Sequence, residues 1–226
     1  MTSRIPIWFD IDGTLVNTRV GKDAFQTALE EVYGWEDTFE NVVFAGNTDL
    51  QVLMDFAEVH AGNRDGALPE KLVFFDRMAY HLDKGLLETP PRPVPGAVDL
   101  LHRLMGDDKV VLGLITGNAR DCAYIKLKHA DMDVFFKHGG FGDEHHDRNH
   151  LANIAQEKLR ITHGDLTSGW VIGDTPRDVQ AAKHIGARCL GVVTHFSEEE
   201  LFEAGADHVV TDLNPTDALM EILLQA

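Results

Sequence analysis

The chain has 226 residues, of which 44% are hydrophobic and 25% are charged, and its formal net charge is −17. This length and composition are typical of a folded globular protein with a sizeable core. The strong negative charge argues against nucleic acid or an anionic membrane surface as a partner, because both favour a basic face. No apolar run is long enough to predict a signal peptide or a membrane span.

The two cysteines, Cys122 and Cys189, lie far apart in the sequence. They form neither a disulfide framework nor a zinc-binding spacing. We expect both to be small buried side chains, and a reducing cytoplasm fits this cysteine usage best.

Residues 5–15 begin with an apolar run and then carry two acids, Asp10 and Asp12, one residue apart. This pattern predicts a buried strand that delivers both carboxylates to the edge of a sheet. Side chains at i and i+2 of an extended chain point the same way, so the two acids can share one small site. Two negative charges this close require either that one acid is protonated or that a cation lies between them.

The stretch between residues 17 and 91 shows helical periodicity. One helical pattern includes Phe25 and stops at Gly34, and further apolar stripes begin at Leu50 and Leu72. The proline-rich residues 89–96 then end this stretch, because prolines deny both helix and ladder hydrogen bonds. The sequence therefore predicts a helical domain followed by a stiff break.

From residue 96 onward, predicted helices alternate with predicted strands. The expected helices are 97–105, 120–129, 151–161, 179–185, 197–202 and 215–224, and the expected strands are 110–115, 134–136, 169–173, 187–193 and 208–210. Apolar strands separated by helices predict a parallel sheet covered on both faces. We expect an α/β fold with a doubly wound, Rossmann-like core of residues 1–16 and 92–226 and an inserted α-helical cap of residues 17–91.

Polar residues follow the predicted strands, at the sheet edge where folds of this class bind ligands. Asp10 and Asp12 follow the first strand, and Asp174 and Asp178 follow a later one. Several carboxylates in one cleft require a divalent cation. Since these strand ends carry no Cys or His, their oxygen ligands favour Mg²⁺ over Zn²⁺.

A phosphoryl group would complete such a site. The hydroxyl of Thr116 and the backbone amides of Gly117 and Asn118, at a predicted helix N-terminus, suit phosphate oxygens. Arg148 supplies positive charge beside them.

Together these segments resemble the four motifs of the haloacid dehalogenase superfamily, and most closely its phosphoglycolate phosphatase-like branch. The matching residues are Asp10-x-Asp12-Gly13-Thr14, Thr116-Gly117-Asn118, a basic residue and Gly173-Asp174-Thr175-x-x-Asp178. Their order and spacing match along almost the whole chain, and the helical stretch resembles the inserted cap of that family. Most of the branch carries Lys in the third motif, where this chain has Arg148.

The resemblance implies a role for each motif residue. Asp10 is expected to be the nucleophile that forms an aspartyl-phosphate, and Asp12 the general acid and base. Asp10, Asp174 and the backbone carbonyl of Asp12 are expected to bind Mg²⁺, with Asp178 orienting the water ligands or Arg148. An acid at Asp12 argues against dehalogenation, because a halide leaves without a proton.

We therefore expect a Mg²⁺-dependent phosphatase of small phosphorylated metabolites, phosphoglycolate-like or sugar phosphates, that is a monomer or a dimer. A sugar-phosphate mutase is the main alternative, since it shares the nucleophile, the acid/base residue and the cap. A non-catalytic binding protein on this scaffold is a remote alternative, because it predicts loss of a catalytic residue, and Asp10, Asp12, Thr116 and Asp174 are all present.

Three further groups of polar residues are candidates for a functional role. Asn47 and Thr48 either lie near the leaving group of the substrate or begin a helix at Leu50, with Thr48 or Asp49 as its N-cap. Arg19 and Lys22 are candidates for the wall of the cleft. The spacing of His145, His146 and His150 matches no known metal-ligand pattern, so we interpret that segment as a solvated loop.

Overall fold

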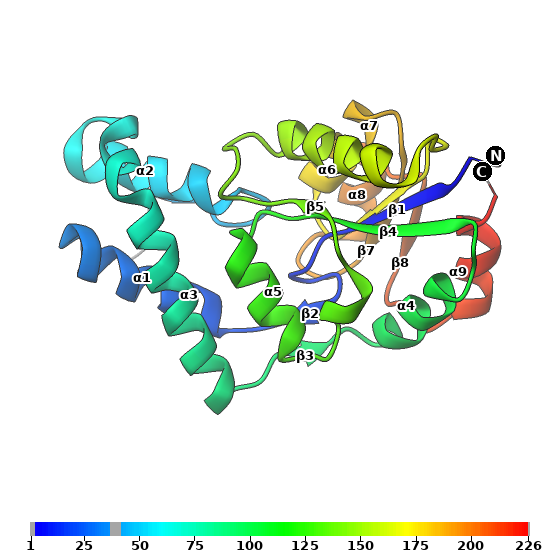
Figure 1. Ribbon diagram of the computed structural model, residues 1–226, viewed down its shortest axis with the longest axis horizontal. Helices are drawn as coiled ribbons and strands as arrows, with labels where there is room; N and C mark the ends of the chain where they lie inside the picture. Colours follow the sequence, from blue (N-terminus) through cyan, green and yellow to red (C-terminus); the bar gives the residue numbers. More distant parts are fainter. Residues whose placement is uncertain (1–2, 37–41, 226) are drawn as a thin grey trace.

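A six-stranded parallel sheet with helices on both faces forms the centre of the molecule (Figure 1). The computed structural model describes residues 3–36 and 42–225. The strand order is β5-β4-β1-β6-β7-β8, with bounds β1 Ile5–Phe9, β4 Val110–Ile115, β5 Gly139–Gly140, β6 Trp170–Gly173, β7 Arg188–Val192 and β8 His208–Val210. This arrangement confirms the predicted doubly wound, Rossmann-like fold.

Each face of the sheet has its own apolar cluster, because side chains along a strand alternate between faces. Ile7 and Phe9 of β1 face the cluster that includes helices α4 (Ala97–Met105), α5 (Arg120–Lys128) and α9 (Thr216–Leu223). Trp8 faces the cluster that includes α6 (Arg148–His163), α7 (Pro176–His184) and α8 (Glu198–Ala204). The sheet is therefore buried on both sides, as its apolar strands predicted.

Strand β1 is central and pairs with β4 on one side and β6 on the other. Phe9 lies opposite Leu114 of β4 and Ile172 of β6. The backbone N–H of Asp10 then donates to the Ile172 carbonyl at 2.9 Å. The residues that follow these three strands consequently meet at one edge of the sheet.

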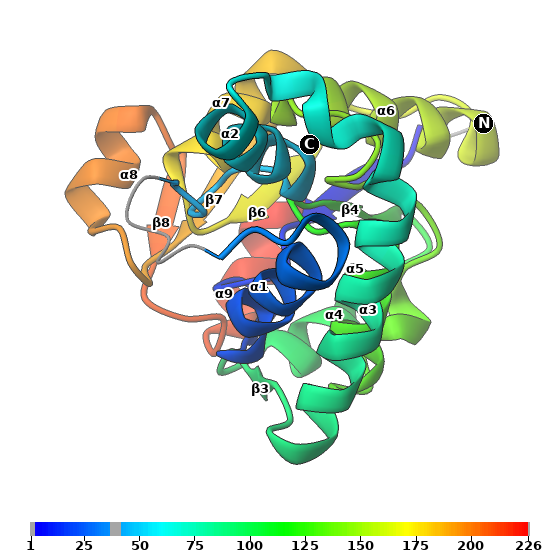
Figure 2. The same cartoon turned by 90° about the vertical axis from the view of Figure 1, so that its left-hand side faces the viewer.

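The described residues between β2 and β3 form a helical insert with its own core, made of α1 (Val20–Tyr33), α2 (Asp49–Ala61), the 3₁₀ helix η1 (Arg64–Glu70) and α3 (Lys71–Glu88). The rings of Phe56 and Phe74 pack on Phe25, with centroid distances of 5.8 and 4.9 Å. The insert lies beyond the carboxyl ends of the strands (Figure 1), and Figure 2 looks onto it with α1, α2 and α3 in front. Residues 37–41 of the predicted helical stretch lie outside the described residues.

The two connections between the insert and the sheet pair with each other, which the sequence did not predict. Strands β2 (Val16–Asn17) and β3 (Arg92–Pro93) form an antiparallel two-stranded ribbon. The prolines of residues 89–96 were expected to prevent any ladder. That expectation is wrong, because Pro93 needs no N–H here and the next residue, Val94, donates to the Leu15 carbonyl at 2.9 Å.

Two strand predictions differ from the structure. Residues 134–136 form no strand; the 3₁₀ helix η2 (Asp133–Phe135) stands there, and the edge strand is β5. Phe136 packs its ring on Phe9 at 5.9 Å between centroids, so this apolar run covers the sheet rather than joining it. The first strand ends at Phe9, because the Ile11 carbonyl accepts from the N–H groups of residues 14–16 and turns the chain.

Helices α6 and α7 begin three residues earlier than their apolar periodicity predicted. Asp147 is the N-cap of α6 and accepts from the backbone N–H of Asn149, and Thr175 and Asp178 form a capping box at the start of α7. The first turns are polar, so an apolar stripe cannot reveal them. Arg148 and Asp178 consequently lie in first helical turns, not in loops.

Cys122 and Cys189 are buried free thiols, as predicted. Within residues 3–36 and 42–225, no helix is both long enough and apolar enough to cross a membrane.

The insert is bonded to the loops at the sheet edge through the start of α2. The backbone N–H groups of Asp49 and Leu50 donate to the carbonyls of Gly117 and Gly142 at 2.7 and 3.0 Å, and the Asp49 carboxylate accepts from the Ala119 N–H at 2.7 Å. A Cβ atom at Gly117 would lie 2.2 Å from the Asn47 carbonyl oxygen, so only glycine permits this approach. Insert and sheet are therefore in direct backbone contact.

This contact predicts a pH-dependent stability. Burial raises the pKa of Asp49 to about 7, and the Ala119 N–H and Lys126 only partly oppose it. Because the unfolded carboxyl titrates at about 4, the folded state binds more protons between about pH 4 and 7, and the free energy of unfolding falls as pH rises through that range. Asp49→Asn keeps the acceptor oxygen without the charge, so we expect its melting temperature to exceed that of the wild type by about 2–4 °C at pH 8 and to match it at pH 4.

The control is Asp76→Asn on α3, which removes an exposed carboxylate and should change the melting temperature equally at both pH values. If Asp49→Asn changed the melting temperature equally at pH 4 and pH 8, the raised pKa of Asp49 in the folded state would be contradicted.

Candidate active site

A cavity of about 630 Å³ lies between the carboxyl ends of the strands and the helical insert. The core side contributes Asp10, Asp12, Gly117, Asn118, Lys126, Arg148 and Asp174, and the insert side contributes Arg19, Lys22, Phe44, Asn47 and Asp49. The sheet topology and the insert together thus bring most of the candidate residues into one concave site.

Arg148 connects two of the predicted acids. Its Nη2 lies 3.0 Å from Oδ1 of Asp10, 2.5 Å from Oδ1 of Asp178 and 3.1 Å from the Ile115 carbonyl oxygen. Arg148 and both carboxyl groups are buried, and Arg148 sits in the first turn of α6. One guanidinium therefore compensates two buried negative charges.

Asp178 is bonded through both of its carboxylate oxygens. Oδ2 accepts from the backbone N–H and the hydroxyl of Thr175 at 3.0 and 2.7 Å, while Oδ1 accepts from Arg148. These bonds hold Asp178 against Arg148, and an orienting role for Asp178 in the reaction stays a prediction.

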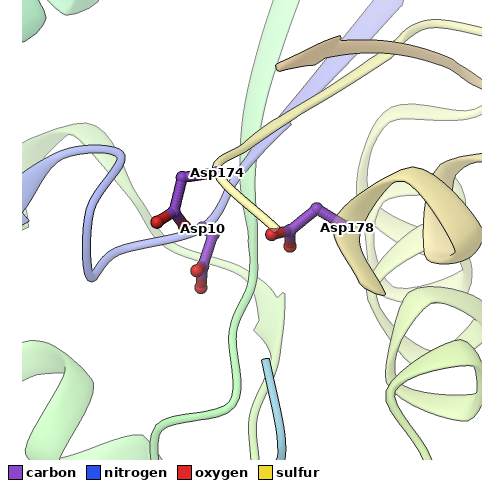
Figure 3. A group of neighbouring side chains, drawn as sticks. All are labelled: Asp10, Asp174 and Asp178. Atoms are coloured by element: carbon purple, nitrogen blue, oxygen red, sulfur yellow. The ribbon is translucent and has the colours of Figure 1, made fainter. Parts of the chain in front are cut away.

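Asp174, by contrast, has a free oxygen. Its Oδ2 accepts from the Thr194 hydroxyl, whereas its Oδ1 is buried and has no hydrogen-bond partner among the described residues. Gly13, with φ of +80°, allows this close packing, because a Cβ there would lie 2.2 Å from Oδ2 of Asp174. Figure 3 shows the Asp10 and Asp174 carboxylates side by side, with Asp178 reaching in from α7.

The three acids Asp10, Asp174 and Asp178 each offer an oxygen within 4.8 Å of the others. Burial, with repulsion from Asp10 and Asp178, raises the pKa of Asp174 to about 8. Burial also raises the pKa of Asp10 to about 6, although Arg148 opposes this shift. A hard divalent cation fits here, because the free Asp174 oxygen could bind it. Its positive charge would also reduce the repulsion among the three carboxylates.

Asp12 lines the same cavity as Asp10, but its carboxylate does not belong to this acidic cluster. Its carboxylate lies 2.6 and 2.8 Å from Nζ of Lys126 and 2.8 Å from Nδ2 of Asn118. The chain leaves the extended conformation after Phe9, so the i, i+2 rule of a strand no longer holds at Asp12. Each acid thus has its own cation, Arg148 for Asp10 and Lys126 for Asp12.

The predicted phosphate-binding segment is partly engaged in internal bonds. Thr116 is buried, does not line the cavity, and its hydroxyl accepts from the backbone N–H and the side-chain amide of Asn118 at 3.3 and 2.9 Å. At the N-terminus of α5, Asp49 and Asp143 accept from the N–H groups of Ala119 and Arg120. Gly117 and Asn118 remain at the cavity wall, and a phosphate role for Thr116 stays a prediction.

Of the candidates on the insert side, Arg19, Lys22 and Asn47 line the cavity. Thr48 instead is the N-cap of α2, because its hydroxyl accepts from the Gln51 N–H at 3.0 Å. The same hydroxyl donates to the His146 carbonyl at 3.0 Å. The capping interpretation of Thr48 therefore describes its contacts, and Asn47 is the neighbour that faces the cavity.

The histidines His145, His146 and His150 stack their rings, with centroid distances of 4.4 Å and 4.1 Å from His145. Among the described residues, the one group of three potential metal ligands is the aspartate cluster. His145 and His146 lie in the loop before α6, as interpreted, whereas His150 lies in the first turn of α6, so the loop interpretation is wrong for that residue.

Several residues of the site were not found by sequence reasoning. Lys126 gave a weak signal, since it follows Cys122 by four residues on the buried face of α5. Asp49 was considered only as a helix cap. Thr194, which bonds Asp174, and the cavity residues His195 and Phe196 follow β7, a strand end that carried no recognisable motif.

The chain is similar to known proteins along most of its length. The family model of haloacid dehalogenase-like hydrolases matches residues 7–192. The chain is 27% identical to 2-deoxyglucose-6-phosphate phosphatase 1 of Saccharomyces cerevisiae, over 91% of this chain and 86% of that protein. It is 23% identical to phosphoglycolate phosphatase of Agrobacterium fabrum, over 96% of this chain and 92% of that protein.

Among solved structures, CbbY of Rhodobacter sphaeroides in complex with phosphate superimposes with a TM-score of 0.69 at 18% identity, covering 93% of this chain and 95% of that one. That similarity concerns the fold. Because the family model spans most of the chain and includes all four motif segments, the chain belongs to the haloacid dehalogenase-like hydrolase family, as a phosphatase-type enzyme.

Proposed function

We propose that this enzyme is a Mg²⁺-dependent phosphatase that hydrolyses small phosphorylated metabolites through a phosphoryl intermediate on Asp10. The observation that carries the proposal is the buried pair of Asp10 and Asp174, which has a free Asp174 oxygen and lies beside Arg148 at the cavity wall. The two buried free cysteines suit a reducing compartment such as the cytoplasm.

In the first step, a carboxylate oxygen of Asp10 attacks phosphorus and the ester P–O bond breaks. Asp12 gives its proton to the leaving alkoxide oxygen. In the second step, Asp12 takes a proton from a water molecule whose oxygen attacks phosphorus, and the bond from phosphorus to Asp10 breaks. The enzyme is restored and inorganic phosphate leaves.

The carboxylates of Asp10 and Asp174 and the backbone carbonyl of Asp12 would hold Mg²⁺. When bound, the ion supplies positive charge that offsets the repulsion between the attacking carboxylate and the phosphoryl oxygens. Arg148 contributes a second, permanent charge, and Gly117 and Asn118 face the same space.

The helical insert is proposed to act as a cap, with residues 17–91 as cap domain and residues 1–16 and 92–226 as core domain. Its side of the cavity combines Arg19, Lys22 and Asn47 with the apolar rings of Phe25 and Phe44. Such a wall suits an anionic or polar metabolite with an apolar carbon frame, and a closed cap keeps bulk water from the phosphoryl group.

Phosphate release from a panel of phosphorylated metabolites, phosphoglycolate and sugar phosphates included, would test the proposal and rank the substrates. Release of free phosphate supports a phosphatase. Turnover that depends on a bisphosphate primer and transfers rather than releases phosphate would favour a sugar-phosphate mutase. Binding without turnover of any panel member would favour a non-catalytic role.

Replacing the nucleophile should abolish turnover without unfolding the protein. Asp10→Asn retains the size of the side chain but cannot form the phosphoryl intermediate, so we expect phosphate release to fall by at least about 10³-fold, with a melting temperature no lower than that of the wild type. Retention of more than a tenth of wild-type activity would refute Asp10 as nucleophile.

Removal of the metal should abolish activity and lower stability. We expect EDTA to stop phosphate release, Mg²⁺ to restore it, and saturating Mg²⁺ to raise the melting temperature of the wild type by a few degrees. Asp174→Ala should lose both responses, because its free oxygen is a proposed ligand. The matched control Asp76→Ala, on the outer side of α3, should keep both.

Arg148 should be required for stability as well as activity. Arg148→Met leaves Asp10 and Asp178 buried without their cation, which typically costs about 3–5 kcal/mol, and we expect a correspondingly lower melting temperature. Arg148→Lys retains the charge but has a single nitrogen, so it should recover most of the stability and only part of the activity. Equal melting temperatures for wild type and Arg148→Met would argue against the ion pairs.

A further inference from the structure

Lys126 is a buried cation whose charged end reaches the active-site cavity. Its side chain is 5% exposed, and it belongs to α5, eight residues after Asn118. Nζ lies 2.6 and 2.8 Å from the two oxygens of Asp12 and 2.6 Å from Oδ1 of Asn118. All three donors of the ammonium group can therefore be used by two side chains of the site.

The contacts of Lys126, Asp12 and Asn118 form a closed triangle. Asn118 accepts from Lys126 through Oδ1, which turns its Nδ2 toward Asp12 at 2.8 Å and toward the Thr116 hydroxyl at 2.9 Å. The Asp12 side chain is itself 45% exposed and follows the end of β1, so the strand does not fix it. The triangle is what holds this carboxylate in one orientation.

The charge of Lys126 matches this role. Burial disfavours a charged lysine, yet the charge and hydrogen bonds of Asp12, with the charge of Asp49, outweigh burial and raise the pKa of Lys126. The insert covers the group from the other side, since a Cβ at Gly21 of α1 would lie 3.7 Å from Nζ. Lys126 thus sits where the insert, α5 and the acid/base residue meet.

Building on the proposed role of Asp12, we propose that Lys126 is a positioning residue: with Asn118, it holds the Asp12 carboxyl group at the cavity wall for both proton transfers. It touches neither the attacking carboxylate of Asp10 nor, in this arrangement, the Asp174 oxygen proposed to bind the metal. Its effect on the reaction therefore passes through Asp12.

This role predicts that the effect of replacing Lys126 depends on how basic the leaving group of the substrate is. An alkyl phosphate releases a strongly basic alkoxide and needs the proton that Asp12 delivers. 4-Nitrophenyl phosphate releases a stable phenolate and needs that proton far less. Misplacing Asp12 should therefore slow the first chemical step with the alkyl ester and leave the same step with the aryl ester nearly unchanged.

The test is single-turnover cleavage with Mg²⁺ and excess enzyme, measured as release of the alcohol or of 4-nitrophenolate. The alkyl substrate is the phosphate ester that the wild type cleaves fastest. For Lys126→Met we expect the aryl-to-alkyl rate ratio to rise by about 10-fold or more. The matched control is Lys128→Met on the same helix, which removes an exposed lysine and should keep the wild-type ratio.

A purely structural role for Lys126 would lower the two rates by the same factor, because only the fraction of folded enzyme would change, and an unchanged ratio overturns the inference. If Lys126→Met does not fold, the same comparison is made with Lys126→Gln, which places a neutral N–H donor where the ammonium group was. We expect its aryl-to-alkyl rate ratio to lie above that of the wild type and below that expected for Lys126→Met. No cleavage of any ester by the wild type would instead remove the proposed phosphatase function and this inference with it.

Discussion

The repulsion among carboxylates at the end of the sheet is the constraint on which the rest of this structure depends. Asp10, Asp174 and Asp178 offer oxygens within 4.8 Å of one another, and all three are buried. Ionised acids at that spacing are costly in a low-dielectric site. A buried arginine, held by the capping box of α7, compensates part of this charge, and one Asp174 oxygen has no hydrogen-bond partner among the described residues.

The sheet topology makes this concentration of charge possible. Because β1 lies between β4 and β6, the segments that follow three distant strands meet at one edge. The segments that carry the acids and Arg148 are fixed by local backbone chemistry: a turn closed on the Ile11 carbonyl after β1, and helix caps at Asp147 and Thr175 at the starts of α6 and α7. The acids are positioned by hydrogen-bonded turns and first helical turns. Their carboxyl groups therefore have little freedom to move apart, although they repel one another.

The helical insert adds a second set of interactions to the same edge. Its α2 N-terminus bonds to the loops at Gly117 and Gly142, and its Asp49 accepts the N–H of Ala119 at the start of α5. An anion at that helix start would compete with Asp49. The insert therefore covers the cavity and also contributes charged side chains to its wall.

The sequence by itself determined the fold class, most helices, and the motif acids, because these are encoded in local periodicity and in short patterns with fixed spacing. It missed the ribbon at Pro93 and the polar first turn of α6, since neither has an apolar signature.

Only the tertiary structure decided which charge meets which. Arg148 pairs with Asp10 and Asp178, and Lys126 pairs with Asp12, across 114 residues of chain. The structure shows Thr48, which the sequence left as either a substrate contact or a helix cap, as the N-cap of α2. Such pairings depend on distances between elements remote in sequence, and no local pattern specifies them.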